Sequence, residues 1–276
     1  YRHADILRAS VATYGNDHRL GANEAPPAII SVFLGEKLTQ ILENIQRGKV
    51  TKATNADLID LGIFSLPTLS KDNTDRNRTS PFAFTGDKFE FRAVGSSQNI
   101  SFPAMVINTI VAESLDELAE KIKTKNSKNI NQAVLEVLKE EISYSKAVLF
   151  NGDNYSREWE IEAARRGLPN EKTTPTALKA LTTVKALNLF EKYQVLSNPE
   201  LKSRQLIHVD RYIKDLEIEV KCLNTLCTSQ IIPAAVVYQK KLADAINSTR
   251  QALGNAASVT AEIELLKKIT DLINSI

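Results

Sequence analysis

Residues 206–223 read LIHVDRYIKDLEIEVKCL, and apolar side chains recur along them at alternating intervals of three and four residues. This spacing is typical of a helix that presents one narrow apolar seam to a partner helix. The seam consists of Leu206, Val209, Ile213, Leu216, Val220 and Leu223. We therefore predict that this part of the chain is helical and that another helix covers the seam.

Two later segments are candidates for the partner helix. One covers about 236–252, after the helix-breaking Pro233, and the other is a terminal helix with apolar residues at near-heptad spacing up to Ile276. Antiparallel packing of the three helices would bury their seams in a small bundle or hairpin. The apolar pattern is still running at Ile276, so we expect truncation there or a helix end held by another subunit. Because the chain begins at Tyr1 and its single methionine is Met105, we expect a piece of a longer protein.

The chain from residue 104 to the seam is also predicted to be helical. Apolar residues recur at helical spacing over about 102–123 and 130–148. Thr174 and Pro175 have the residue types of a helix N-cap and of a first helical position. The residues expected on the buried side of that helix are Leu178, Leu181 and Leu187.

The first 103 residues have a different composition. They hold seven of the ten glycines, five of the nine prolines and seven of the nine phenylalanines, a mixture that favours strands, turns and loops. One amphipathic helix interrupts them, and Gly48 stands where its C-cap would lie. Its apolar positions are Leu38, Ile41, Leu42 and Ile45. We predict an α+β chain, with a mixed part at 1–103 and a helical region at 104–276 that includes an antiparallel helical bundle.

Composition excludes several classes of function. The 276 residues are 43% hydrophobic, enough for a sizeable core. The 35 basic and 33 acidic residues are mixed along the chain, which argues against a nucleic-acid or anionic-membrane partner. No run of 18 apolar residues and no secretory signal occurs, so we expect a soluble, cytoplasmic protein. Cys222 and Cys227 are expected to be buried thiols, because further zinc ligands are lacking nearby.

Residues 88–92 read KFEFR, and strict alternation of charged and aromatic residues is typical of a strand. Lys88, Glu90 and Arg92 would line one face, while the two phenylalanines enter the core. One interpretation is a surface strand with a solvated charged face. The other is a polar cleft, in which a carboxylate binds a cation beside two groups that bind anions. The strand by itself favours the first interpretation.

Two loops upstream carry further polar groups. Residues 75–81 read DRNRTSP, and arginines on a loop offer planar forks for phosphate or carboxylate, although an exposed turn would look similar. Residues 18–27 read HRLGANEAPP. A flap hinged at Gly21 would bring Glu24 over a ligand, but an ordinary connection has the same residue types.

In this order, the three segments resemble glutamine synthetases. In that family an arginine precedes an E-A-P flap, an N-R-S/T loop follows, and a strand reads basic-x-Glu-x-Arg. This chain has Arg19 with 24–26, then 77–79, then 88–92. The strings GNDHRLGANEAPPAIISVFLG and NRTSPFAFTGDKFEFRAVGSSQ resemble the type III branch, and FNGDNYSREW and RRGLPNEKTTP extend the resemblance over essentially the whole chain.

The resemblance implies a fold and a reaction. Residues 1–103 would be the C-terminal part of the family's catalytic α/β domain. The reaction would be ATP-dependent ligation of ammonia to the γ-carboxylate of glutamate through a γ-glutamyl phosphate. Glutamate, ammonia and ATP would be the substrates, Mg²⁺ or Mn²⁺ the cofactor, and a ring-shaped homo-oligomer in the cytoplasm the assembly.

The resemblance also implies roles for individual residues. Arg19 would bind the α-carboxylate of glutamate, and Arg92 the γ-carboxyl end. Glu24 would close over the site and attract or deprotonate ammonium. Arg78 would stabilise the phosphoryl group during transfer.

Lys88 and Glu90 complete the set. Lys88 would contact nucleotide phosphates in place of a family arginine, and Glu90 would bind one divalent cation. No basic residue lies between Arg78 and Lys88, a departure from the commoner bacterial pattern. The family takes its other metal ligands from upstream sequence, and none of the three histidines stands in a matching motif. We therefore expect this chain to be inactive alone.

Two alternatives stay open. The helical region is also suited to an assembly or regulatory module, since an apolar seam fits a subunit interface as well as a core. A related ligase that joins glutamate to another amine would use the same arginines.

Overall fold

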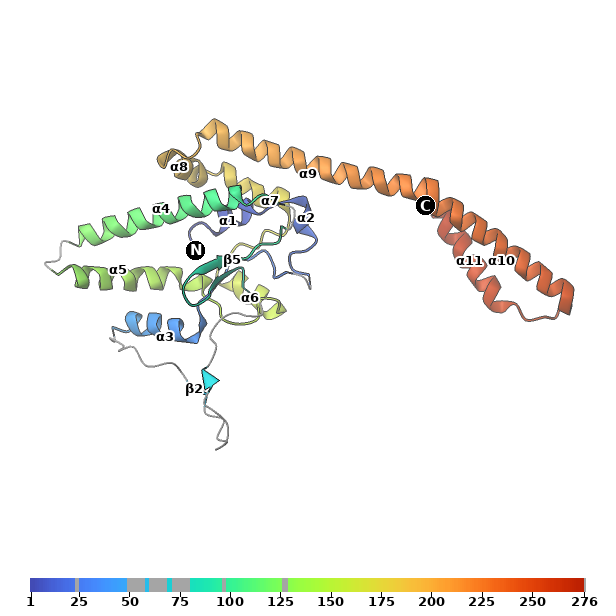
Figure 1. Cartoon of the computed structure of the whole chain (residues 1–276), viewed down its shortest axis with the longest axis horizontal. Coiled ribbons are helices and arrows are strands. Elements are labelled where there is room, and N and C mark those ends of the chain that lie inside the picture. Colours follow the sequence, from blue (N-terminus) through green and yellow to red (C-terminus); the bar gives the residue numbers. More distant parts are fainter. Residues whose placement is uncertain are drawn as a thin grey trace. The chain divides into compact units, whose positions relative to one another are not determined.

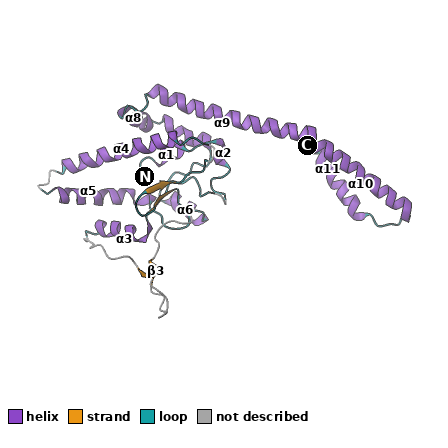
Figure 2. Cartoon of the chain, viewed as in Figure 1, coloured by secondary structure: helices purple, strands orange, loops and turns teal. Residues whose placement is uncertain are grey.

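A computed structural model of the chain describes residues 1–22, 25–48, 80–95, 98–125 and 129–275, together with the backbone of 58–59 and 69–70. These residues are mostly helical (Figure 2). They form two units, Tyr1–Tyr212 and Ile213–Ile276. The boundary predicted after residue 103 lies inside the first unit, so the division into a catalytic part and a helical region stays a prediction.

The first unit combines a small sheet with many helices (Figure 1). Its elements are α1 (Ala4–Ser10), α2 (Tyr14–Asp17), β1 (Val32–Phe33), α3 (Gly35–Gln46), β2 (Leu58–Ile59), β3 (Leu69–Ser70), β4 (Phe82–Phe84), β5 (Phe89–Phe91), α4 (Ser101–Thr124), α5 (Ile130–Ser145), η1 (Lys146–Val148), α6 (Arg157–Arg165), α7 (Thr174–Ala177), η2 (Leu178–Thr182), α8 (Val184–Lys192) and the beginning of α9 (Asn198–Leu226).

Helix positions agree closely with the sequence pattern. Helices α4 and α5 occupy the two predicted stretches, although α5 ends at Ser145, three residues early. Helix α3 ends before Gly48, whose φ of 74° is the left-handed conformation favoured by glycine after a helix. At α7 the N-cap is Thr173, one residue before the predicted Thr174, and the proline still lies in the first turn.

The three-stranded sheet places the segment 88–92 against an earlier strand. Strand β4 lies between β1, which is parallel to it, and β5, which is antiparallel. Glu90 pairs with Ala83 across the antiparallel ladder. Phe91 packs against the main core, as predicted, but the side chain of Phe89 is 52% exposed and packs on Phe82 and Phe84 instead. The prediction that both phenylalanines are buried is therefore wrong for Phe89, because only one end of this short strand lies over the core.

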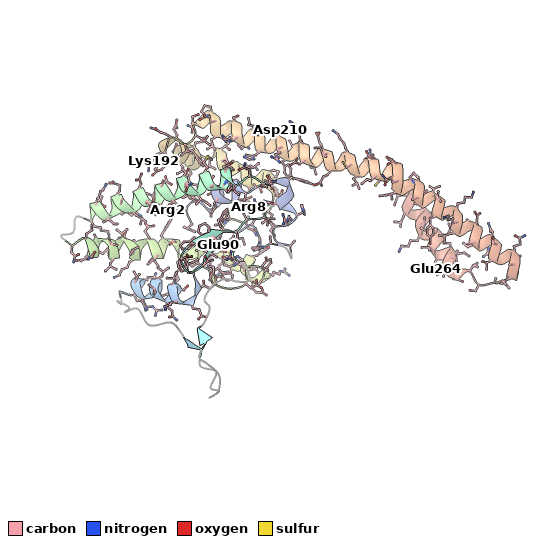
Figure 3. The ribbon with its side chains drawn as sticks, in the orientation of Figure 1. Arg2, Arg8, Glu90, Lys192, Asp210 and Glu264 are labelled. Atoms are coloured by element: carbon pink, nitrogen blue, oxygen red, sulfur yellow. The ribbon has the colours of Figure 1, made fainter. Side chains whose placement is uncertain are left out.

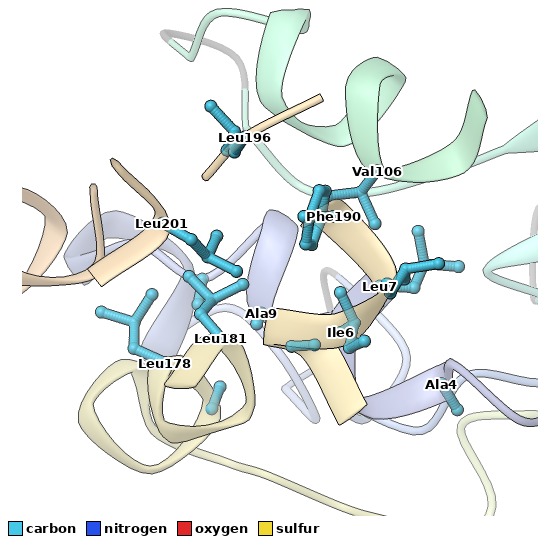
Figure 4. Packing of buried hydrophobic residues seen from close by; sticks show 14 of the residues in the cluster. Ala4, Ile6, Leu7, Ala9, Val106, Leu178, Leu181, Phe190, Leu196 and Leu201 are labelled. Carbon is cyan, nitrogen blue, oxygen red and sulfur yellow. The ribbon is translucent and has the colours of Figure 1, made fainter. Parts of the chain in front are cut away.

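The main core joins the beginning of the chain to the helical region. Figure 4 shows Ile6 and Leu7 of α1 packed among Leu178, Leu181 and Phe190 from η2 and α8. These side chains are at most 4% exposed. Residues more than 170 positions apart in the sequence thus share one core, which holds α1 against the later helices.

The second unit is a helical hairpin. It consists of the end of α9, a π-helical turn at Cys227–Ile231 (η3), α10 (Ile232–Leu253) and α11 (Thr260–Asn274). Helices α10 and α11 pack against each other, and the side chain of Gln239 donates a hydrogen bond to Thr270 at 2.7 Å.

Two expectations about this unit are wrong. The seam of α9 was expected to pack against α10 and α11, but η3 joins α9 to α10 in one continuous helical stretch, and Leu216 and Leu223 are exposed. Cys222, expected to be buried, is exposed too, and Cys227 is half-buried.

The stretch from Asn198 to Leu253 is also long and apolar enough to cross a membrane, by length and composition alone. The same exposed apolar surface on a helix is found where protein subunits meet.

Candidate functional site

Three charged residues alternate with the phenylalanines of β5: Lys88 precedes the strand, Glu90 lies within it and Arg92 follows it. Because side chains alternate along a strand, Lys88, Glu90 and Arg92 project to the same side. Nε and Nη2 of Arg92 donate to Oε2 of Glu90 at 3.2 and 3.1 Å. Nζ of Lys88 lies 3.9 Å from Oε1 of the same carboxylate. The predicted order of cation, carboxylate and cation is therefore present on one face.

The three side chains differ in their contact with solvent. The side chain of Arg92 is 18% exposed, that of Glu90 40% and that of Lys88 65%. The backbone N–H of Arg92 donates to the carbonyl oxygen of Pro81 at 2.7 Å, which extends the ladder between the two strands. Arg92 is thus the most buried of the three side chains, and Lys88 is the most exposed.

Arg19 lies in the turn that follows α2. Its backbone N–H donates to the carbonyl oxygen of Asn16 at 3.1 Å, and so does that of Leu20 at 3.0 Å. Asn16 is buried, and its Nδ2 donates to the carbonyl oxygen of Val11 at 2.7 Å. The turn is therefore tied to the core through a buried amide, while the side chain of Arg19 is half-buried.

The stem of the predicted flap is closed by backbone contacts. Leu20 and Ala25 form an isolated bridge, and the N–H of Gly21 donates to the carbonyl oxygen of Ala25 at 3.1 Å. Gly21 has a φ of 79°, so the hinge position uses the conformation that glycine permits. Glu24 and Arg78 lie outside the described residues.

A small cavity joins the flap stem to the end of β5. It has a volume of about 40 Å³, and Leu20, Ala25, Pro26 and Arg92 are among the residues that line it. Two segments that the sequence singled out separately are therefore neighbours in space. Arg8 in α1 also lines this cavity.

The described residues do not provide a complete metal site. Among them, no group of three or more His, Cys, Asp and Glu side chains is close enough to hold an ion. Glu90 supplies one carboxylate, and two cations flank it. Since Mg²⁺ and Mn²⁺ need several oxygen ligands, these residues alone do not fit such an ion.

The sequence did not point to a polar cluster behind Arg19. Asp17 accepts hydrogen bonds from the backbone N and from Oγ1 of Thr174, at 2.8 and 2.7 Å. Nε of Arg8 donates to the carbonyl oxygen of Glu171 at 3.0 Å, and Nη2 lies 3.8 Å from Asp17 Oδ1. Burial lowers the pKa of Arg8, while Asp17 and then Glu171 oppose that shift. The position of Asp17 in the string GNDHRLG, two residues before Arg19, was the available signal.

Comparison with known proteins agrees with the motif pattern. Residues 133–250 match the family model of the glutamine synthetase C-terminal domain. The type-3 glutamine synthetase of Dictyostelium discoideum is 44% identical over 275 residues, which cover 99% of this chain and 37% of the relative. A glutamine synthetase of Bacteroides fragilis (strain YCH46) is 42% identical over 248 residues, 88% of this chain and 34% of the relative.

A third relative matches a similar share of its own length. A glutamine synthetase of Butyrivibrio fibrisolvens is 38% identical over 277 residues, 97% of this chain and 38% of the relative. The chain therefore spans little more than a third of the length of these curated relatives.

Proposed function

The chain belongs to the glutamine synthetase family, and we propose on this basis that it forms the C-terminal part of an ATP-dependent glutamate–ammonia ligase. The reaction would transfer the γ-phosphoryl group of ATP to the side-chain carboxylate of glutamate. Ammonia would then attack the γ-glutamyl phosphate and release phosphate and glutamine. The structural observation that supports this proposal most directly is the row of Lys88, Glu90 and Arg92 on one face of the β5 strand.

The glutamate-binding role of the arginines follows from their chemistry. A guanidinium presents parallel N–H donors that match the two oxygens of a carboxylate. Arg92 is largely buried and anchored by its backbone, so little side-chain entropy is lost when it binds. We assign the γ-carboxyl end of glutamate to Arg92 and the α-carboxylate to Arg19. The cavity between the flap stem and Arg92 supports one shared site.

Charge decides the other assignments. Transfer brings a carboxylate and a phosphoryl group together, so positive charge must be fixed around both. Arg78 would stabilise the phosphoryl group, and Lys88 would contact the phosphates of ATP as a flexible point charge. Glu24 would hold and deprotonate ammonium, because only neutral ammonia is a nucleophile. Closure of the flap would also keep water from the acyl phosphate.

Glu90 would bind a divalent cation together with ligands from other parts of the full-length protein. Bound Mg²⁺ or Mn²⁺ would neutralise phosphate charge. In the structure Glu90 pairs with Arg92 and Lys88, and the inactivity of this chain alone is part of the proposal. A ring-shaped homo-oligomer and a cytoplasmic location are part of the same proposal.

The test is phosphate release by the full-length protein with glutamate, ATP, Mg²⁺ and ammonia. Glu24→Ala and Arg92→Ala should each reduce kcat/KM by about 100-fold or more. Arg47→Ala is the matched control, because that arginine is 66% exposed and pairs only with its helix neighbour Glu43 among the described residues. Wild-type rates in both site variants would refute the assignment, and faster turnover with a primary alkylamine than with ammonia would favour the related amine ligase.

Assembly is a second candidate function of the helical region. It is favoured by the exposed seam of α9, where Ile213, Leu216, Val220 and Leu223 are 40% to 61% exposed. Soluble proteins rarely leave such a continuous apolar stripe in water. We assign this seam to contact with a second copy of the chain, which is compatible with the ligase assignment.

A further inference from the structure

We propose that Asp17 and Thr174 are positioning residues for Arg19, so that the helical region takes part in the glutamate site. This inference rests on the proposed function, because it deepens the role given to Arg19. It differs from that proposal in assigning residues that contact no substrate. It also gives the loop before α7 a role in the affinity for glutamate.

Asp17 and Thr174 form a partly buried contact between distant parts of the sequence. Thr174 is 1% exposed, and both its backbone N–H and its hydroxyl donate to the Asp17 carboxylate. Thr174 is the first residue of α7, where backbone N–H groups have no partner within the helix. Asp17, which lies in α2, thus accepts the hydrogen bond of an N–H group at the beginning of α7. The N–H and the hydroxyl of Thr174 together fix both oxygens of the Asp17 carboxylate.

Arg8 of α1 forms an ion pair with the same carboxylate. Its side chain is buried, at 2% exposure, and Figure 3 labels it in α1 within the first unit. Nε is fixed by the carbonyl oxygen of Glu171, in the loop that leads to Thr174. Nη2 of Arg8 lies 3.8 Å from Oδ1 of Asp17, an ion pair that is too long for a hydrogen bond, and the Arg8 side chain is poorly solvated. Helices α1 and α2 and the loop before α7 therefore meet at one aspartate.

The position of α2 determines the position of the Arg19 backbone. Asp17 is the last residue of α2, and the carbonyl oxygen of its neighbour Asn16 accepts from the N–H groups of both Arg19 and Leu20. A tilt of α2 would therefore move the backbone of Arg19 and the stem of the flap together. Misplacement of a binding group by about 1 Å can cost about 100-fold in rate or affinity. The contact with Thr174 is suited to prevent such a tilt.

A purely structural role makes a different prediction. Loss of a buried hydrogen bond would then lower the melting temperature and the amount of folded enzyme, and the KM values of the folded fraction would not change. A positioning role raises the KM for glutamate and leaves the KM for ATP unaffected. Comparing the change in the KM for glutamate with the change in the KM for ATP therefore distinguishes a positioning role from a structural role.

The experiment measures steady-state kinetics and thermal unfolding of the full-length protein. Thr174→Val removes the hydroxyl but keeps the shape, and we expect the KM for glutamate to rise by about tenfold while the KM for ATP stays within about twofold. Thr174→Ser keeps the hydroxyl and should restore the KM. Thr176→Val is the matched control, because its hydroxyl is exposed on the same helix and bonds only locally.

Two further variants keep the outcome decisive. If Thr174→Val does not fold, Asp17→Asn replaces it, since an amide can accept only one of the two hydrogen bonds; a rise of at least about threefold in the KM for glutamate is expected. Arg19→Ala tests the underlying assignment. Wild-type KM values in the Thr174 and Asp17 variants, together with a raised KM in Arg19→Ala, would overturn the positioning inference alone. No effect of Arg19→Ala would overturn the proposed site as well.

Discussion

Arg92 directs two nitrogens, Nε and Nη2, at one oxygen of Glu90, at 3.2 and 3.1 Å. The second oxygen of Glu90 faces Lys88 at 3.9 Å. The carboxylate is therefore shared between a rigid fork and a flexible point charge. A single strand sets this order, because neighbours on the same face of a strand are two residues apart.

Replacing the fork by a point charge should weaken glutamate binding. In Arg92→Lys the positive charge stays, but the second charge-assisted hydrogen bond is lost, which is worth about 1.5 to 3 kcal/mol. We expect the KM of the full-length protein for glutamate to rise by about tenfold or more. Arg47→Lys serves as the exposed control, and equal KM values for the two variants would contradict the role of Arg92.

The environment of Trp159 should respond to acid. The pKa of Glu162 is lowered to about 2, because its carboxylate accepts hydrogen bonds from Arg165 and Arg166. A carboxyl whose pKa is lower in the folded state stabilises it above the unfolded value of 4.5, and this contribution is lost as the pH falls from 4.5 towards about 2. Arg166 then loses a partner while it lies 5.3 Å from the ring of Trp159.

Fluorescence measures this change directly, since the chain has one tryptophan. We expect the emission of Trp159 to shift over this pH range in the wild type and to lose that transition in Glu162→Gln. Identical titration curves for the two proteins would show that another group controls the tryptophan.

The shared core should depend strongly on Phe190. This side chain is fully buried against α1 and α4, and Phe190→Ala should lower the free energy of unfolding of the first unit by about 3 to 5 kcal/mol. Val184→Ala, on the same helix at 74% exposure, should change it by less than about 0.5 kcal/mol. Urea unfolding followed by the fluorescence of Trp159 gives both values, and similar losses in the two variants would contradict the core assignment.

The exposed seam of α9 should control the size of the assembly. Leu216→Asp with Leu223→Asp places charge on the seam, and we expect the mass of the full-length complex in analytical ultracentrifugation to fall while helix content is retained. Ile218→Asp is the matched control. That residue is 59% exposed, and two positions from Leu216 it lies off the seam.

An unchanged mass in the double variant would refute the assembly role. Flotation of the wild type with lipid vesicles, lost in the double variant, would instead assign the apolar stretch between Asn198 and Leu253 to a membrane.

Much of the fold could be predicted from local patterns. Helices α3, α4 and α5 follow from apolar spacing, and Gly48 follows from the conformation that a helix end requires. The strand at 88–92 and its charged face follow from alternation. Each of these features depends on residues within a few positions of one another, so the local sequence is sufficient to predict it.

Features that depend on distant residues could not be predicted in this way. The burial of Arg8 is decided by a loop more than 160 residues later, and nothing within its own helix indicates it. The exposure of Cys222 and of the α9 seam depends on η3, which joins α9 to α10 as one stretch instead of turning the chain back. A helical pattern states which face is apolar, but it does not state whether the chain folds back to cover that face.

The amino-acid sequence by itself therefore determined the helices, the charged strand and the family resemblance of the motifs, because periodicity and motif spacing are local properties. Only the tertiary structure decided that Asp17 meets Thr174, that the flap stem shares a cavity with Arg92, and that the α9 seam is left uncovered in the described residues. The physical reason is that packing and ion pairing act between side chains that are close in space, however far apart they are in the chain.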